Sequence, residues 1–123
     1  QIVYYGMSNN IVIYHNPRWG KSRNSVGILE EKNINYRVVN YIKHPLSESE
    51  LKNIAKKLGF RPKDFIRKSE KDFKNLSLSN KLEDDDALYI AMSKFPKLIE
   101  RPIVVNKNKA CIGRPPEKIL DII

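Results

Sequence analysis

Residues 11–24 read IVIYHNPRWGKSRN, and the rest of the chain is organised around this stretch. Its first four residues form an apolar run typical of a buried strand, and a proline and a glycine then interrupt strand and helix alike. Ser22 follows as a candidate N-cap, and a helix beginning there would direct its first N–H groups into the loop, where they and the helix dipole favour an anion. The loop around Gly20 is therefore predicted to bind an oxyanion. Its basic neighbours are Arg18, Lys21 and Arg23.

The remaining segments alternate between helical and extended patterns. Ser47 and Glu50 have capping-box spacing before one helix, and Gly59 stands where a helix end prefers glycine. Because the first two strands are joined by a helix, they are expected to be parallel. The order predicts an α/β fold with a four-stranded mixed sheet, flanking helices and a helical insertion. Expected helices span residues 22–32, 48–58, 62–66, 70–76, 84–94 and 116–121, and expected strands span 11–14, 36–41, 101–105 and 109–113.

The length of 123 residues suits one domain, which we assign to residues 7–123. Residues 1–6, QIVYYG, precede a methionine that resembles a natural start, and we interpret them as added in cloning or encoded upstream. They are β-prone and could add a strand at a sheet edge. No apolar run approaches the roughly 20 residues of a membrane helix, and no signal peptide is visible. We therefore expect a cytoplasmic monomer that does not contact a membrane.

The formal charge of +9 raises the possibility of nucleic-acid binding. Residues 51–75 hold nine basic residues against three acidic ones. No series of aromatic stacking residues and no recognised nucleic-acid motif accompanies this charge. A solvated helical surface is therefore the favoured interpretation, and no nucleic-acid partner is expected. The basic residues are Lys52, Lys56, Lys57, Arg61, Lys63, Arg67, Lys68, Lys71 and Lys74.

Four separated pieces of the sequence together resemble the glutaredoxin-coupled arsenate reductases, which have a thioredoxin-like fold. The resemblance implies that Arg67, Arg101 and Arg114 converge on the oxyanion together with Gly20, since guanidinium groups offer planar forks that keep their protons. It also implies a cis proline beside the active loop, for which Pro102 is the candidate. The four pieces are HNPRWGKSRN at 15–24, FIRK at 65–68, RPIVV at 101–105 and IGRPPE at 112–117.

The same resemblance places the catalytic positions at His15, Trp19 and Ser22. In the family a cysteine stands at position 19 and attacks arsenate, while the histidine and the helix N-terminus lower the pKa of that thiol. Glutathione, as co-substrate, and then glutaredoxin resolve the adduct to release arsenite, with no bound cofactor and no metal. The indole of Trp19 is not a nucleophile for this step. The chain as written is therefore expected to be inactive.

Cys111 is the only cysteine, so no intrachain disulfide and no Cys-x-x-Cys motif is possible within this chain. Its place in an expected strand favours a small buried hydrophobe over a substitute nucleophile. Three origins of Trp19 stay open: a substitution, an error in the sequence, or a natural member of the family that has lost the reaction. The retained arginines favour the first two.

Two other functions stay open beside the reductase. One is a regulator similar to the Spx proteins, which share the fold and bind the α-subunit of RNA polymerase instead of catalysing. The loss of the cysteine suits that role, whereas the motifs around His15 and Arg114 resemble the reductases more closely. The other is a non-catalytic protein that binds an oxyanion such as arsenate or phosphate.

Overall fold

The structure of the chain, a computed structural model, describes residues 2–4, 11–15 and 20–123. Its residues divide into two compact units. The sheet unit comprises residues 1–44 and 101–123, and the helical unit comprises residues 45–100. The assignment of a single domain to residues 7–123 stays a prediction.

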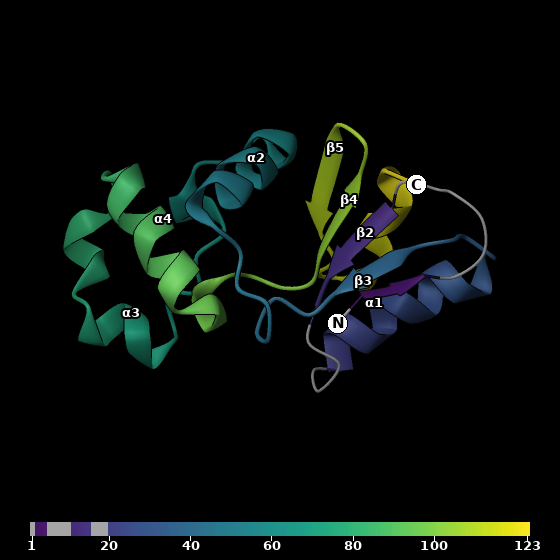
Figure 1. Ribbon diagram of the computed structural model, residues 1–123, viewed down its shortest axis with the longest axis horizontal. Helices are drawn as coiled ribbons and strands as arrows, with labels where there is room; N and C mark the ends of the chain where they lie inside the picture. The colour runs from purple at the N-terminus through teal and green to yellow at the C-terminus, as the bar shows by residue number, and fades with distance from the viewer. Residues whose placement is uncertain (1, 5–10, 16–19) are drawn as a thin grey trace. The chain divides into compact units, whose positions relative to one another are not determined.

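The sheet unit contains five strands in the order β1-β3-β2-β4-β5 (Figure 1). The parallel pair β2–β3 and the antiparallel hairpin β4–β5 confirm the expected four-stranded mixed sheet. The fifth strand, β1, pairs antiparallel with β3 and comes from the segment before Met7, so the β-prone residues there do extend the sheet. The strands are β1 (Ile2–Tyr4), β2 (Ile11–Tyr14), β3 (Arg37–Val39), β4 (Ile103–Asn106) and β5 (Lys109–Ile112).

Strand β2 lies in the middle of this sheet, and its side chains fix the pairing. Ile11 and Ile13 are buried, while Val12 and Tyr14 are half-buried. Ile13 pairs with Val38 on one side and with Val104 on the other. A slip by one residue would turn the buried face of β2 outward, so burial enforces the register.

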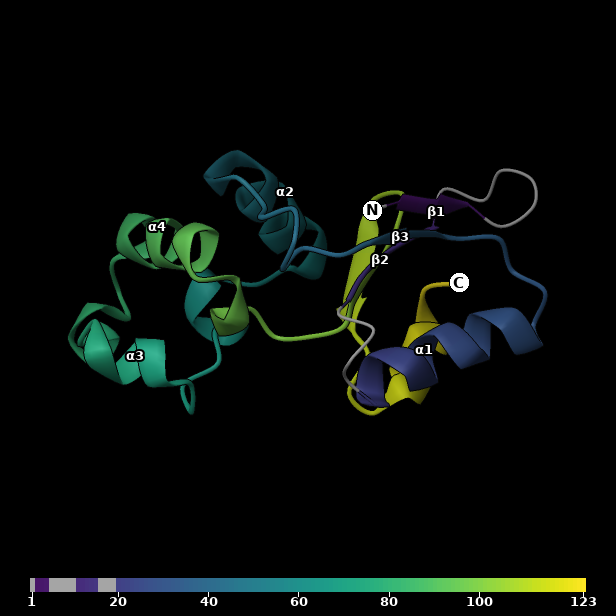
Figure 2. The same ribbon diagram turned by 60° about the horizontal axis from the view of Figure 1, so that its bottom comes forward.

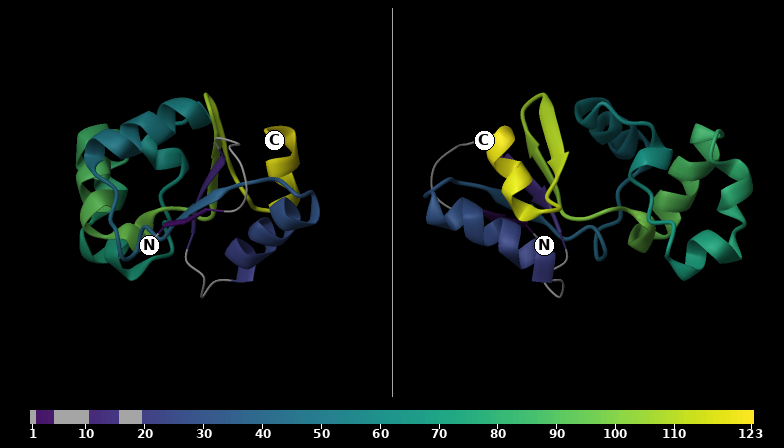
Figure 3. Two further views of the ribbon diagram at one scale, coloured as in Figure 1. Left: turned by 45° about the vertical axis from the view of Figure 1, so that its right-hand side comes forward. Right: turned by 180° about the vertical axis from the view of Figure 1, so that it is seen from behind.

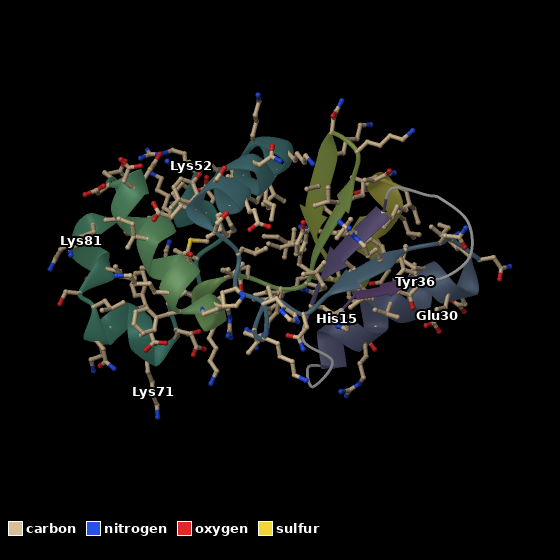
Figure 4. All side chains as sticks on the ribbon, in the orientation of Figure 1. His15, Glu30, Tyr36, Lys52, Lys71 and Lys81 are labelled. Atoms are coloured by element: carbon tan, nitrogen blue, oxygen red, sulfur yellow. The ribbon has the colours of Figure 1, made fainter. Side chains whose placement is uncertain are left out.

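One face of the sheet is covered by α1 (Gly20–Glu31) and by the 3-10 helix η4 (Pro116–Asp121), which lie side by side (Figures 2 and 3). The helix expected at residues 116–121 is present, as a 3-10 helix. The hydroxyl of Tyr36 donates a hydrogen bond to Glu30 Oε1 at 2.7 Å beside this core (Figure 4). The buried cluster consists of Ile11, Ile13, Leu29, Tyr36, Val104 and Ile119.

The prediction that Ser22 is the N-cap of α1 is wrong. The helix begins two residues earlier, at Gly20, and Ser22 lies within its first turn. The first N–H groups of a helix have no intrahelical partner, so a glycine at this position sacrifices little helical stability. The start of α1 therefore lies closer to His15 than the sequence pattern indicated.

The helical unit follows local signals closely. Ser47 Oγ accepts the N–H of Glu50 at 3.1 Å and the carboxylate of Glu50 accepts the N–H of Ser47 at 3.0 Å, which confirms the capping box. Gly59 ends the helix in the left-handed region, with φ of 72°, as expected. Asp84 caps the next long helix by accepting the N–H of Ala87. The elements are α2 (Glu48–Leu58), η1 (Pro62–Asp64), α3 (Lys71–Asn75), η2 (Leu78–Lys81), α4 (Asp85–Lys94) and η3 (Pro96–Leu98).

Helices α2 and α4 pack against each other in this unit through side chains that are almost fully enclosed (Figure 1). Leu51 of α2 and Leu88 and Met92 of α4 have no exposed surface. No helix among the described residues is long and apolar enough to cross a membrane.

Candidate functional site

His15 follows the last residue of β2 and is buried, with 5% of its surface exposed (Figure 4). Its backbone N–H donates to the carbonyl of Val39 at 3.1 Å, which continues the ladder between β2 and β3 by one residue. Because β2 and β4 are antiparallel and Tyr14 pairs with Ile103, His15 lies at the end of the sheet where β4 begins. The predicted histidine thus stands beside the predicted cis proline.

The segment that enters β4 contains two predicted site residues, Arg101 and Pro102. The peptide bond between them is cis, which confirms the prediction for Pro102. The N–H of Gly113, directly after β5, donates to the carbonyl of Pro102 at 2.9 Å. Arg101 and Arg114 therefore flank one backbone hydrogen bond at the open end of the β4–β5 hairpin. The peptide bond from Arg114 to Pro115 is also cis, which the sequence did not predict.

Helix α1 approaches the same end of the sheet through Gly113. A Cβ atom on Gly113 would lie 2.6 Å from Ser25 Oγ and 3.1 Å from Pro102 Cγ, so only a residue without a side chain fits there. Ser25 lies in the second turn of α1 and is fully buried. Four residues join His15 to Gly20, the first residue of α1. Strand register and this close packing thus bring together His15, Arg101, Arg114 and the beginning of α1.

Trp19 lies outside the described residues, and Gly20 is placed only as the first residue of α1. The third predicted arginine, Arg67, belongs to the helical unit. Its side chain is 18% exposed and pairs with Glu70, at 2.9 Å from Nη1, and with Glu100, at 3.3 Å from Nε. Its convergence with the other two arginines stays a prediction.

The two carboxylates beside Arg67 were missed by sequence reasoning. Glu70 stands three residues after Arg67, a spacing at which opposite charges often meet, so it could have been found. Glu100 is distant in sequence and meets Arg67 only because the chain folds back on itself. Its position carries no local sequence signal.

Cys111 lies in β5 and is half-buried. Burial, together with the charge of Asp121, raises the pKa of its thiol to about 11, although Lys118 opposes this shift. A thiol with this pKa is almost entirely protonated near neutral pH, and it is the thiolate that acts as a nucleophile. Its raised pKa therefore argues against Cys111 as a substitute for a cysteine at position 19.

The basic stretch in the helical unit is partly neutralised by acidic residues near the start of α4. Lys52 pairs with Asp86, Arg61 with Glu83 and Asp85, and Lys63 with Glu83. The hydrogen bonds from Lys63 and Arg61 lower the pKa of the Glu83 carboxyl. These pairs favour a solvated, ion-paired surface over a binding site for nucleic acid.

Within the part of the chain that the structure describes, no group of three or more His, Cys, Asp or Glu side chains could hold a metal ion. The groups that the structure places at this end of the sheet are arginines, an imidazole and backbone N–H groups. Arginine forks and a helix N-terminus both recognise tetrahedral oxyanions.

Comparison with known proteins identifies relatives of this chain. The model of the ArsC family matches residues 14–122. The arsenate reductase of Haemophilus influenzae is 42% identical over 115 residues, which are 93% of this chain and 99% of the relative. The uncharacterised protein YfgD of Escherichia coli is 41% identical over 118 residues, which are 95% of this chain and 99% of the relative.

Solved structures agree with the sequence matches. The structure of an arsenate reductase from Vibrio cholerae covers 95% of this chain and 100% of its own, with a TM-score of 0.91 and 42% identity. That similarity confirms the thioredoxin-like fold. The family match and the identities above lead to one conclusion: this chain belongs to the ArsC family.

Proposed function

We propose that this protein derives from a reductase of arsenate or a related oxyanion that uses glutathione and glutaredoxin, with a cysteine thiolate at the position of Trp19. Arsenate must gain two electrons to become arsenite, and two thiols supply them by forming a disulfide. The sequence relatives named arsenate reductase support the substrate class. The proposal also includes glutathione and glutaredoxin as the reductants, and a protein that acts in the cytoplasm as a monomer.

The observation that supports this proposal is the strand register, which brings the backbone of His15 to the end of the sheet where Arg101 and Arg114 flank the bond between Gly113 and Pro102. Arg101 and Arg114 would hold the oxyanion by charge-assisted hydrogen bonds. The N-terminus of α1 would favour the same anion and also a thiolate in the loop. By the family resemblance, Arg67 would supply the third guanidinium.

His15 has a different role in this scheme. A buried imidazole beside the loop would donate a hydrogen bond to the thiolate of the family's cysteine and so lower its pKa. With tryptophan at position 19 no thiolate is present for it to stabilise. His15 still takes part in the β2–β3 ladder, through the bond to Val39.

The experiment is a glutathione- and glutaredoxin-coupled arsenate reduction assay on the chain as written and on its Trp19→Cys variant. We expect no turnover by the former and clear turnover by the latter, at least about 10³-fold above it, because removal of a nucleophile costs at least that factor in other enzymes. Cys111→Ser in both backgrounds is the matched control. It should leave both rates unchanged, since Cys111 is almost entirely protonated at assay pH.

Failure of both forms would count against arsenate reduction and turn attention to the other two functions. Recovery of the RNA polymerase α-subunit in a pull-down would then support a regulator. Phosphate or arsenate binding that weakens in Arg101→Ala would instead support a non-catalytic anion-binding protein.

A further inference from the structure

Arg67 stands between two carboxylates in the helical unit. Glu70 Oε2 accepts a hydrogen bond from Nη1 at 2.9 Å, and Glu100 Oε1 lies 3.3 Å from Nε. The side chains of Arg67, Glu70 and Glu100 are 18%, 24% and 30% exposed. Pairs at this depth hold their geometry better than fully exposed ones, because water competes less for the charges.

The backbone beneath this cluster is tied together by two segments distant in sequence. The N–H of Arg67 donates to the carbonyl of Leu98 at 2.7 Å, and the N–H of Glu100 donates to the carbonyl of Phe65 at 2.9 Å. A bridge between Ile66 and Ile99 lies between these two bonds. Phe65, Leu98 and Ile99 are fully buried. Arg67 and Glu100 are therefore fixed to the same small piece of buried framework.

The two contacts use only part of the guanidinium. Arginine has five N–H donors in a planar fork. Glu70 takes one hydrogen of Nη1, and Glu100 faces the Nε side. Among the described residues, Nη2 takes part in neither contact, so it can still donate to an oxyanion. Contacts at Nη1 and at Nε, on two different sides of the guanidinium, restrict its rotation and thus fix where Nη2 points.

We propose that Glu70 and Glu100 are positioning residues that hold the guanidinium of Arg67 in one orientation for binding an oxyanion. This inference rests on the anion-binding role proposed above for Arg67. It makes a prediction opposite in sign to simple electrostatics. Removal of a negative charge near an anion site would by itself tighten anion binding, whereas removal of a positioning residue weakens it.

The test uses steady-state kinetics in the active Trp19→Cys background. Glu100→Gln should raise KM for arsenate about fivefold or more and leave kcat within about twofold, because a mispositioned binding group loses ground-state and transition-state binding alike. Glu70→Gln should act in the same direction. Glu83→Gln is the matched control, since Glu83 loses the same charge in the same unit but pairs with Arg61 and Lys63. Its KM should be unchanged.

A KM that falls or stays constant in both Glu100→Gln and Glu70→Gln would overturn the inference. Restoration of a carboxylate in Glu100→Asp should recover part of the lost affinity, which a general loss of structure would not predict. Chemical unfolding of each variant separates a folding defect from a change in affinity.

A second readout does not need turnover. The Nε–H resonance of Arg67 in a ¹H–¹⁵N spectrum, assigned by its absence in Arg67→Lys, should be sharp in the parent and broadened by solvent exchange in Glu100→Gln. An unchanged resonance would count against positioning. If the Trp19→Cys protein reduces no arsenate, the proposed function fails, and this resonance alone decides whether Glu100 orients Arg67.

Discussion

The sheet unit depends on contacts between segments far apart in the chain, whereas the helical unit depends on contacts between residues close in sequence. In the sheet unit, Arg101 and Arg114 lie at the same end of the sheet as His15 only because three strands from distant parts of the chain pair in one register. In the helical unit, Ser47 caps α2 through a residue three positions away. This difference predicts how far the effect of a substitution extends. A substitution in the sheet unit should disturb the whole candidate site, whereas a substitution at a helix cap should disturb only that end of the helix.

The largest effect on stability is expected from Gly113→Ala. A methyl group would lie 2.6 Å from Ser25 Oγ and 3.1 Å from Pro102 Cγ, so the buried Ser25 hydroxyl must rotate, or α1 or the hairpin end must shift. We expect a loss of about 1–3 kcal/mol in the free energy of unfolding. Hydrogen exchange should speed up in α1 and at the ends of β4 and β5. Denaturant unfolding together with exchange measures both.

The double variant Ser25→Gly, Gly113→Ala tests the cause. Deletion of the Ser25 side chain removes the closest obstacle, so the two changes together should cost less than the sum of each alone. Additive losses, or a stable Gly113→Ala protein with unchanged exchange in α1, would break the proposed contrast between the units.

A smaller effect is expected in the helical unit from Ser47→Ala. Loss of an N-cap hydroxyl costs about 1 kcal/mol. The faster hydrogen exchange should be confined to the first turn of α2, where Glu50 donates to Ser47. Ser49→Ala, one residue inside the helix and exposed, is the control and should have little effect. Faster exchange across the whole unit would show that the cap is not local.

The smallest effect, of opposite sign, is expected from Gly27→Ala. Gly27 lies inside α1, lines a hollow of about 380 Å³ between α1 and η4, and has no atom within 4 Å of an added Cβ. Because glycine weakens a helix interior, alanine should stabilise the protein by about 0.5–1 kcal/mol. A thermal melt measures the gain. If Gly27→Ala instead destabilised the protein, the open space beside α1 would not be what determines the effect of this substitution on stability.

Local chemistry explains which parts of the fold were predictable. Ser47, Glu50 and Gly59 act on backbone groups within a few residues, so their spacing was sufficient to predict α2. The strand pattern of residues 11–14 likewise predicted β2, and Pro102 was found through the resemblance of its segment to a family. Ser22 misled because a serine is a frequent cap, whereas Gly20 already begins the helix.

The candidate site was predictable as a set of residues but not as an arrangement. His15, Arg101 and Arg114 were identified, and the sheet register then places them at one end of the sheet. The contact between Glu100 and Arg67 and the close approach of Gly113 to Ser25 depend on distances between segments far apart in the chain. No spacing rule encodes such contacts, because tertiary packing creates them.

The strand β1 has a practical consequence for handling this protein. It covers the outer edge of β3, while His15, Arg101 and Arg114 lie at the ends of β2, β4 and β5. Because Ile2 pairs with Val39, whose carbonyl accepts the N–H of His15, a purification tag placed before β1 would start at the same end of the sheet as the proposed chemistry. Trimming the chain back to Met7 would instead expose an unpaired strand edge, the kind of surface on which proteins self-associate. Expression, solubility and the proposed chemistry should therefore all respond to the choice of N-terminus.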